Sequence, residues 1–524
     1  MPLNPNPDVF DVLVVGAGPV GLVAGCELAR RGVRVRVIEK LAEPSDQSRA
    51  VAVHARSLDM FERMGIVDEL ISTGIKGIAM QMYAGHSKLF RVPLGGVDSA
   101  FPFTLTTAQT ETENVLGEHL QSFGVTVERG VELVALSQDD GAAHVTLRHQ
   151  DGSTEQAGAS WVIGADGGHS TVRRLVGTKL AGSFVGERFL LGDVDADHNL
   201  DLDSMHTFFS PEGPVIVLPM RDGRMRFLAE VHDAPGTPIN MHPTQEDLQA
   251  VIDRRIGGIR VLHSHWLTGF EIHHALVPAY RWGRVFLAGD AAHIHSPAGG
   301  QGMNTGMQDA FNLGWKLAAV LRGEAGDTLL DSYQAERLPV ADGVISFTNL
   351  LTKAGTLSGL PQRIRDVTIR TLSHVPAARR AIAERVEEVN IGYKDSPIAV
   401  GQRPRHAKIA AGEHLPHVLD AAVQKQLGAA RVPENTAHVV VTVTAGHVAP
   451  AADGDGQVHV LVTADETAVA GYDTVIADPN CAVAQRFGLK NGGRVVIRPD
   501  GYIGAVTSLD DTITVADYFA KIRS

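Results

Sequence analysis

A glycine motif near the N-terminus, Gly16-x-Gly18-x-x-Gly21, constrains the fold more than any other feature of the chain. An apolar run precedes the motif, a helical pattern follows it, and a second apolar run ends at Glu39. This order is typical of the β-α-β unit that binds a dinucleotide. In that unit Gly16 permits a tight turn, Gly18 lets the backbone approach a pyrophosphate, and Gly21 lets the helix pack closely on the strand.

The acid at the end of the second apolar run indicates which dinucleotide binds. The Glu39 carboxylate can accept hydrogen bonds from ribose hydroxyls but disfavours a 2′-phosphate, so the motif predicts FAD or NAD rather than NADP. The next residue, Lys40, is a further candidate contact. A glycine motif of this length also arises by chance in a chain with 55 glycines. A β-α-β unit that binds nothing is therefore the alternative.

A second strand-to-helix junction lies between residues 284 and 322. An apolar run ends at Gly289-Asp290, and a long helical pattern begins near Asn304. The loop between them contains Pro297, Gly299, Gly300 and Gly302. Ligands of open α/β sheets bind beyond the carboxyl ends of the strands, and a helix N-terminus offers free N–H groups. The alternative is an ordinary turn in which Asp290 satisfies local backbone N–H groups.

A third junction of the same kind follows a predicted hairpin. The strand that ends at Gly164 leads into Asp166-Gly167 and then into a short basic helix. Three such junctions on one chain suggest one extended ligand that is held at several strand ends. Two other polar residues lie in loops. Arg49 could bind a pyrophosphate or a flavin edge, or be a surface residue, and Gln109 could contact a cofactor or neighbour a helix cap.

The rest of the chain changes character twice. Residues 181–275 alternate in the manner of antiparallel strands, and residues 77–105 are expected to add strands to the same sheet. Helices are expected from 329 to about 390, with Pro339 as a start or a kink and residues 379–388 as an exposed charged segment. The final part, 400–524, has the pattern of a small α/β domain.

Composition argues against several classes of function. The net charge is −13, no run of Lys or Arg occurs and aromatic residues make up 5% of the chain, so nucleic acid is not an expected partner. No apolar run reaches membrane-spanning length and the N-terminus lacks the pattern of a signal peptide, so we expect no membrane association. The two cysteines, Cys26 and Cys481, form no C-x-x-C pair, and the histidines are scattered. We therefore expect no metal site and a cytoplasmic location.

Together the three junctions resemble those of class A FAD-dependent aromatic hydroxylases, the para-hydroxybenzoate and phenol hydroxylase type. The resemblance covers roughly residues 8–350 and rests on the first glycine motif, on Gly164-Ala-Asp166-Gly167, and on Gly289-Asp290-Ala-Ala-His293 with the glycine loop that follows. Residues 400–524, with Arg498-Pro-Asp-Gly501, resemble the thioredoxin-like C-terminal domain of the phenol and polyketide hydroxylase branch. Because that part lacks C-x-x-C, we expect a structural role or a contact in a homodimer.

The resemblance implies an α/β fold: a Rossmann-like FAD-binding domain, an inserted and mostly antiparallel substrate-binding sheet, and a thioredoxin-like C-terminal domain. The FAD-binding domain would comprise residues 1–76, 106–180 and 276–395, the last of which includes a helical linker. The inserted sheet would comprise residues 77–105 and 181–275, and the C-terminal domain residues 400–524.

The resemblance also implies roles for the first set of candidate residues. Gly16, Gly18 and Gly21 would hold the pyrophosphate of FAD. Glu39, with Lys40 beside it, would bind the adenosine ribose.

The remaining candidates would surround the flavin itself. Arg49 and Gln109 would line the flavin side, Asp166 the face shared with nicotinamide, and Asp290 the ribityl or pyrophosphate portion. The loop residues that would border the isoalloxazine ring are Pro297, Gly299, Gly300, Gly302, Met303 and Asn304. Among all candidates, Arg49, Pro297 and Gly299 would lie nearest the chemistry.

The implied reaction uses FAD, NADPH or NADH, and O2. Reduced flavin would form a hydroperoxide whose distal oxygen is transferred to a phenolic or polyketide-type aromatic substrate. The alternatives are a flavin-dependent epoxidase or reductase of the same fold, and a flavin-binding protein without turnover that acts through its C-terminal domain. Every flavin motif precedes residue 322, so removal of residues 400–524 is expected to leave the flavin site intact.

Overall fold

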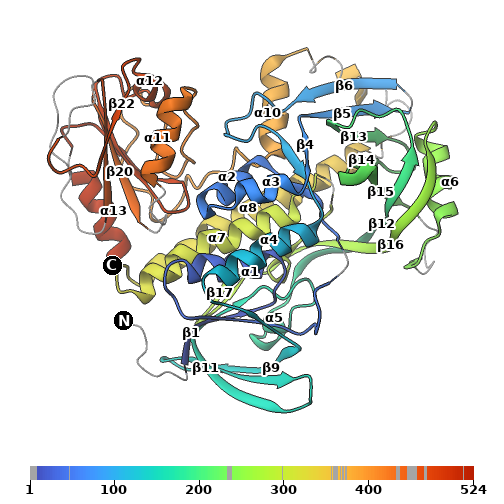
Figure 1. The fold of residues 1–524 in the computed structure, drawn as a ribbon, viewed down its shortest axis with the longest axis horizontal. Helices are drawn as coiled ribbons and strands as arrows, with labels where there is room; N and C mark the ends of the chain where they lie inside the picture. The colour runs from blue at the N-terminus through green and yellow to red at the C-terminus, as the bar shows by residue number, and fades with distance from the viewer. Residues whose placement is uncertain are drawn as a thin grey trace.

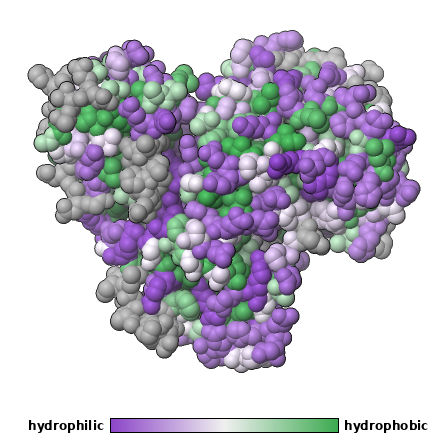
Figure 2. Space-filling model, in the orientation of Figure 1, coloured by the Kyte–Doolittle hydropathy of each residue, from purple (hydrophilic) through white to green (hydrophobic). Residues whose placement is uncertain are grey.

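The computed structural model describes residues 9–524 except 46–47, 86, 233–238, 298, 356, 358–360, 362–363, 366, 369–370, 372–373, 432–436, 445–456, 465–468 and 512. Three large β-sheets, each covered by helices, organise the described part of the chain (Figure 1). The face drawn in Figure 2 is mostly hydrophilic, with apolar residues gathered towards its centre.

The first sheet carries the dinucleotide motif and has the strand order β17-β18-β11-β1-β2-β8, with β10 attached to β11 and β9 attached to β10. Strands β18, β11, β1, β2 and β8 pair in parallel. The register places Val15, Gly164 and Leu287 side by side, so the three strand-to-helix junctions meet at one edge of the sheet. The bounds are β1 Val9–Val15, β2 Val35–Glu39, β8 Val127–Arg129, β9 Val131–Gln138, β10 Ala143–His149, β11 Thr154–Gly164, β17 Arg281–Trp282 and β18 Val285–Leu287.

Glycines let the helices around this sheet pack closely on its strands and on one another. A Cβ on Gly25 of α1 would lie 3.1 Å from Val37 of β2, and a Cβ on Gly314 of α7 would lie 2.6 Å from the Cβ of Glu27. Helix α1 is therefore held between the sheet and α7. The bounds are α1 Pro19–Ala29, α2 Ala55–Met64, α3 Val67–Ser72, α4 Gln109–Ser122, α5 Thr171–Leu175, α7 Gly302–Leu321, α8 Thr328–Gly355 and α10 Pro376–Val386, with 3-10 turns η1 Arg221–Gly223 and η2 Gly289–Ala291.

The second sheet has the order β19-β16-β12-β15-β14-β13-β5-β6 and is antiparallel except where β13 pairs with β5. One face packs against helix α6, Gln245–Arg255, in a core that includes Val194, Phe227 and Leu248. The bounds are β5 Ala79–Ala84, β6 Ser87–Pro93, β12 Ala181–Asp197, β13 Ser204–Phe209, β14 Val215–Pro219, β15 Arg224–Val231, β16 Arg260–Leu276 and β19 His293–Ile294.

The other face of this sheet is called the inner face below. Because side chains alternate along a strand, the register fixes its members. They are Glu187, Phe189, Leu191 and Asp193 on β12, Arg226, Leu228 and Glu230 on β15, and Trp266, Thr268, Phe270, Ile272 and His274 on β16.

The third sheet lies near the C-terminus and has the order β22-β21-β20-β23-β24. Its helix α13, Ile513–Arg523, packs against α7 and α8 in a shared core with Trp315, Leu329 and Tyr518. The other bounds are α11 Ala421–Arg431, α12 Ala482–Phe487, β20 His438–Val443, β21 Gln457–Thr463, β22 Thr474–Ala477, β23 Gly493–Ile497 and β24 Ile503–Thr507; a small sheet joins β3 Ala52–Val53, β7 Thr104–Thr106 and β4 Ile75–Gly77.

The α/β class, the parallel first sheet and the mostly antiparallel second sheet are confirmed. Pro339 lies inside α8, which excludes the helix start and leaves the kink of the two expected roles. One local prediction is wrong: the segment 379–388 does not stay exposed, because Glu387 and Glu388 are 0% and 1% exposed. Helix α6 and the full lengths of β12 and β16 were not predicted. Among the described residues, no helix is long and apolar enough to cross a membrane.

Candidate active site

The three motif glycines differ in what surrounds them. Gly16 has a φ of 103°, and a Cβ on it would lie 2.4 Å from the Ala165 oxygen. A Cβ on Gly21 would lie 1.9 Å from the Gly16 oxygen. At Gly18, in contrast, a Cβ would meet nothing within 4 Å. The fold itself therefore requires Gly16 and Gly21, whereas the space beside Gly18 suits close approach of a ligand such as a pyrophosphate.

Glu39 lies at the end of β2, beside the turn that contains the motif. Its two carboxylate oxygens accept hydrogen bonds from the backbone N–H groups of Ala17, at 2.9 Å, and Leu41, at 3.0 Å. Each oxygen keeps a second lone pair that can accept a hydrogen bond from a ribose hydroxyl. Lys40 is exposed next to it.

Asp166 acts on its own helix. Its carboxylate accepts hydrogen bonds from the backbone N–H groups of Thr171, at 2.6 Å, and Val172, at 3.1 Å, and from the Ser170 hydroxyl. These bonds cap the N-terminus of α5. The structure accounts for Asp166 locally, and its contact with a cofactor stays a prediction.

Asp290 has the opposite environment, because its carboxylate accepts no hydrogen bond from the described residues. The side chain is exposed at the edge where the three strands end. Desolvation by the surrounding protein raises the pKa of Asp290, while the positive charges of His293, Arg49 and Arg173 act to lower it. A carboxylate with unused acceptors at this edge fits the hydroxyl groups of a ribityl or ribose chain.

Arg49 is held in the site through its own loop. The Ala50 N–H donates to Oε1 of Gln109 at 3.2 Å, and the Gln109 N–H donates to the Ser48 hydroxyl at 2.9 Å. Nε2 of Gln109 donates to Glu113 at 2.8 Å. Gln109 is therefore an anchor for the Arg49 loop, and the structure brings the charge of Arg49 close enough to act on Asp290.

The glycine loop before α7 is fixed by Asn304. Oδ1 of Asn304 accepts from the His54 N–H at 2.9 Å, and Nδ2 donates to the oxygens of Ala52 and Gly300, both at 2.9 Å. Asn304 is 0% exposed, and its side chain is used to hold the loop. Helix α7 begins at Gly302, two residues earlier than predicted.

Within that loop the chain turns sharply. Gly299 and Gly300 have φ values of 94° and 65°, in the region that favours glycine, and the Gly300 N–H donates to the Pro297 oxygen at 2.9 Å. Gly302 and Met303 follow in the first turn of α7. All the predicted loop residues therefore lie together at the N-terminus of this helix.

A buried polar cluster that the sequence does not predict lies behind this loop. Nε2 of His54 lies 2.9 Å from the Gly299 oxygen, and Oε2 of Glu387 accepts from the Ala55 N–H at 2.8 Å. Burial acts to lower the pKa of His54, but Glu387 and the charge of Glu388 outweigh it and raise that pKa. No sequence signal pointed here, since the two glutamates end a charged helix that resembles a surface helix.

The inner face touches the Arg49 loop at one end and the loop before α7 at the other. At one end Arg226 forms a bidentate pair with Asp193, at 2.5 Å from its Nε, lies 5.6 Å from the Trp266 ring, and donates to the Arg49 oxygen at 3.2 Å. At the other end Glu187 accepts a hydrogen bond from Ser296, the residue before Pro297.

Between these two ends the inner face is mainly apolar and aromatic. Phe189 and Phe270 stack with ring centroids 5.7 Å apart, and Leu191 and Leu228 pack beside them. This arrangement joins an aromatic floor to the loops that carry Arg49 and Pro297. A substrate site on this sheet is expected from the sequence, but none of these individual residues is.

Glu230 of the inner face has an unusual environment that yields a pH prediction. It is 3% exposed, and its Oε2 has no hydrogen-bond partner among the described residues. Burial, helped by the charge of Glu187, raises the pKa of Glu230 from 4.5 to about 7, although Arg255 opposes the shift. Because the folded-state pKa is raised, the carboxyl destabilises the fold increasingly as the pH rises from 4.5 to about 7.

Glu230→Gln should therefore become more stable relative to the wild type as the pH rises through this window. The gain between pH 4 and pH 8 should be roughly 3 kcal/mol in the free energy of unfolding. Chemical denaturation of both proteins at the two pH values checks it. An unchanged difference between them would show that this carboxyl titrates normally.

Among the described residues, no group of three or more His, Cys, Asp or Glu side chains is arranged to hold a metal ion. The residues that converge at the strand ends are instead those that fit a dinucleotide. The open space at Gly18, the free acceptors of Asp290 and the carboxylate of Glu39 lie where FAD would need them.

Comparison with known proteins agrees with this geometry. A model of the FAD binding domain family matches residues 9–348, and a model of the phenol hydroxylase C-terminal dimerisation domain matches residues 459–524. The 6-methylpretetramide 4-monooxygenase of Streptomyces rimosus is 36% identical over 533 residues, which cover 98% of this chain and 93% of that protein.

Two further comparisons point the same way. The pentachlorophenol 4-monooxygenase of Sphingobium chlorophenolicum is 35% identical over 77% of this chain and 75% of that protein. The solved structure of the anhydrotetracycline hydroxylase OxyS from Streptomyces rimosus is 29% identical, has a TM-score of 0.75, and matches over 98% of this chain and 99% of its own. The chain therefore belongs to the family of FAD-dependent aromatic hydroxylases.

Proposed function

We propose that this protein hydroxylates a phenolic ring of a fused-ring, polyketide-type compound and uses NADPH or NADH and O2 as co-substrates. The observation that carries the proposal is the inner face, an aromatic floor that reaches from the Arg49 loop to the residue before Pro297. A flat apolar ring system lying on Phe189 and Phe270 would therefore be next to the flavin loops. Its similarity over nearly the full chain to a protein named for a polyketide substrate supports the same class.

Each part of the site has a task in this proposal. Gly18, Glu39 and Asp290 bind the pyrophosphate, the ribose and the ribityl portions of FAD. The N–H groups at the start of α7, from Gly302, favour negative charge on the cofactor, because a helix N-terminus carries partial positive charge. FAD supplies the chemistry that activates O2.

The remaining residues orient the substrate and keep water out. The stacked rings of Phe189 and Phe270 and the indole of Trp266 provide an apolar floor that excludes water from the reacting ring. The buried Arg226 and Asp193 pair holds the Arg49 loop against this floor. The match to a dimerisation domain supports a homodimer.

The proposal is tested by purifying the protein, recording its flavin spectrum and measuring NADPH and NADH oxidation with candidate phenols. The panel consists of compounds that appear in the names of similar proteins: 6-methylpretetramide, anhydrotetracycline, pentachlorophenol and p-nitrophenol. The fused-ring compounds should stimulate oxidation more than the single-ring phenols. Stimulation by none of the four would contradict the proposal and favour a flavin-binding protein without turnover.

Arg49→Ala should slow the reduction of bound flavin by NADPH or NADH. A charge-assisted hydrogen bond from Arg49 to the cofactor would contribute about 1.5–3 kcal/mol, so its loss corresponds to roughly a 10- to 100-fold lower reduction rate. Anaerobic stopped-flow absorbance measures the rate. The matched control is Arg91→Ala, because Arg91 forms an exposed ion pair with Asp203. Equal reduction rates in the two variants would show that Arg49 is an ordinary loop residue without a role in flavin reduction.

A further inference from the structure

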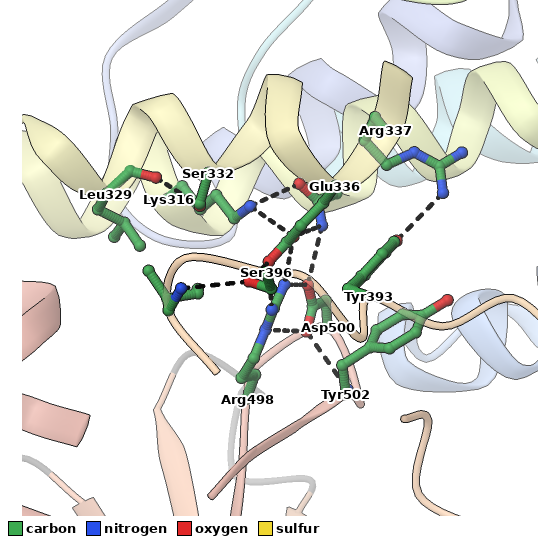
Figure 3. A network of polar contacts seen from close by, with 12 residues as sticks. Lys316, Leu329, Ser332, Glu336, Arg337, Tyr393, Ser396, Arg498, Asp500 and Tyr502 are labelled. Carbon is green, nitrogen blue, oxygen red and sulfur yellow. Dashed lines mark hydrogen bonds and ion pairs between the residues drawn. The ribbon is translucent and has the colours of Figure 1, made fainter. Parts of the chain in front are cut away.

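The turn Arg498-Pro-Asp-Gly501 joins β23 to β24 and points out of the C-terminal sheet into the FAD-binding part of the chain (Figure 3). Gly501 has a φ of 89°, and the turn closes through a bond from the Gly501 N–H to the Arg498 oxygen at 2.9 Å. Arg498 and Asp500 are 2% and 4% exposed. Two charged residues are therefore buried at the tip of a turn.

The first set of contacts from this turn reaches α7 and α8. Nη1 and Nη2 of Arg498 donate to the two oxygens of Glu336, at 2.6 and 2.9 Å, and Lys316 donates to Oε2 of Glu336 at 2.7 Å (Figure 3). Oδ2 of Asp500 accepts from the Trp315 indole at 3.0 Å. The C-terminal turn is thereby bonded to Glu336 of α8 and to Trp315 of α7.

A second path continues from the turn towards the flavin site. The ring of Tyr502 lies 4.1 Å from that of Tyr393, whose hydroxyl accepts from Nη1 of Arg337 at 3.1 Å. Arg337 in turn donates to Oδ1 of Asp309 at 2.7 Å and to the oxygen of Thr305 at 3.0 Å. Thr305 belongs to the first turns of α7, beside the glycine loop.

This path ends at the backbone next to Asp290. Oδ2 of Asp309 accepts from the Gly289 N–H at 3.1 Å and lies 2.8 Å from Nε2 of His293. The side chains of Asp309, Arg337 and His293 are 0% exposed. A continuous set of buried contacts therefore connects the C-terminal sheet to the residue that precedes Asp290.

We propose that the Arg498-Pro-Asp-Gly501 turn and Tyr502 are positioning elements of the FAD site, which act through Arg337 and Asp309 on Gly289 and Asp290. The inference rests on the proposed role of Asp290 in binding FAD. It replaces the expectation that the C-terminal part can be removed without effect on the flavin site. Removal would expose the buried cluster and leave Glu336 without Arg498, its partner from the C-terminal turn.

A double-mutant cycle on FAD release tests the proposal. Tyr393→Phe keeps the ring but removes the acceptor of Arg337, and Asp290→Asn removes the charge at the far end of the path. FAD release from the holoenzyme after dilution is followed by the rise in flavin fluorescence. Tyr393→Phe should accelerate release about fivefold in the wild-type background and less than about twofold in Asp290→Asn, because coupled sites are not additive. Asp331→Asn on α8, which breaks an exposed pair with Arg281 of β17, should leave the release rate unchanged.

The possible outcomes distinguish the positioning role of the C-terminal turn from the role of Asp290 in binding FAD. An equal acceleration by Tyr393→Phe in both backgrounds, or none in either, overturns the positioning role while the assignment of Asp290 stands. Release that is unchanged by Asp290→Asn alone overturns the assignment of Asp290 and the positioning role that rests on it. Neither outcome bears on aromatic hydroxylation, which the panel of phenols tests separately.

Discussion

Glu336→Gln should lower the free energy of unfolding by about 3–5 kcal/mol, because it removes one carboxylate of a buried charge cluster and leaves the buried Lys316 without its ion-pair partner. Glu336 bonds to Arg498, Lys316 and the hydroxyl of Ser396, and its side chain is 0% exposed. Burial acts to raise the pKa of Glu336, but the charges of Arg498 and Lys316 outweigh it and hold that pKa well below its usual range.

Because the pKa of Glu336 is depressed, its carboxylate stabilises the fold fully above pH 4.5, and this stabilisation is lost as the pH falls further. The difference between wild type and Glu336→Gln should therefore be constant at neutral pH and shrink in acid. Denaturation curves at several pH values measure it. Asp331→Asn on the same helix should cost under about 1 kcal/mol, because exposed pairs contribute little. If Glu336→Gln also lowered the free energy of unfolding by less than about 1 kcal/mol, the cluster would not hold the C-terminal sheet in place.

Gly18→Val should abolish FAD binding while the protein stays folded. A Cβ on Gly18 would meet no atom of the described residues within 4 Å, apart from its chain neighbours, and the φ of −74° at Gly18 suits any residue. Valine therefore fits the fold but fills the volume that a pyrophosphate needs. We expect FAD affinity to fall at least about a hundredfold, which corresponds to ~2.8 kcal/mol.

Flavin absorbance of the purified protein and its far-ultraviolet circular dichroism together check this result. Gly117→Val on α4, where a Cβ also meets nothing within 4 Å, is the matched control and should keep its flavin. Gly21→Val should impair folding as well, because its Cβ would overlap the Gly16 oxygen. Full flavin content in Gly18→Val would place the pyrophosphate elsewhere.

The dinucleotide unit and the three junctions could be predicted because their signals are local. Glycine spacing, buried runs and an acid at the end of a strand all lie within about thirty residues of one another. Parallel pairing then brings the junctions together, as the register from Val15 to Leu287 shows. The candidate residues of the first glycine motif, the glycine loop and Asp290 are consequently gathered at one edge of the sheet.

The roles of single side chains were less predictable. Asn304 and Gln109 lie in the site, but their side chains hold neighbouring loops in place. Glu387 and Glu388 looked like the end of a surface helix and are buried behind the glycine loop. Such pairings join residues far apart in the chain, so no sequence pattern reports them.

The inner face and the C-terminal contacts escaped prediction for the same reason. Arg226 and Glu230 look like ordinary polar positions of a half-exposed strand, and only the register shows that they share a face with Phe189. Arg498 and Glu336 are 162 residues apart. The sequence motif around Arg498 was recognised as a resemblance, but its partners became evident only from the fold.

The central claim is that the inner face presents a phenolic ring to oxygen activated at the flavin. The most direct test is the mass spectrum of the product formed under ¹⁸O2 from the panel compound that most stimulates NADPH or NADH oxidation. The account predicts a product that carries one labelled oxygen from ¹⁸O2 and none when the label is supplied as water. Consumption of NADPH with only hydrogen peroxide as product, or a product without the label, would contradict it.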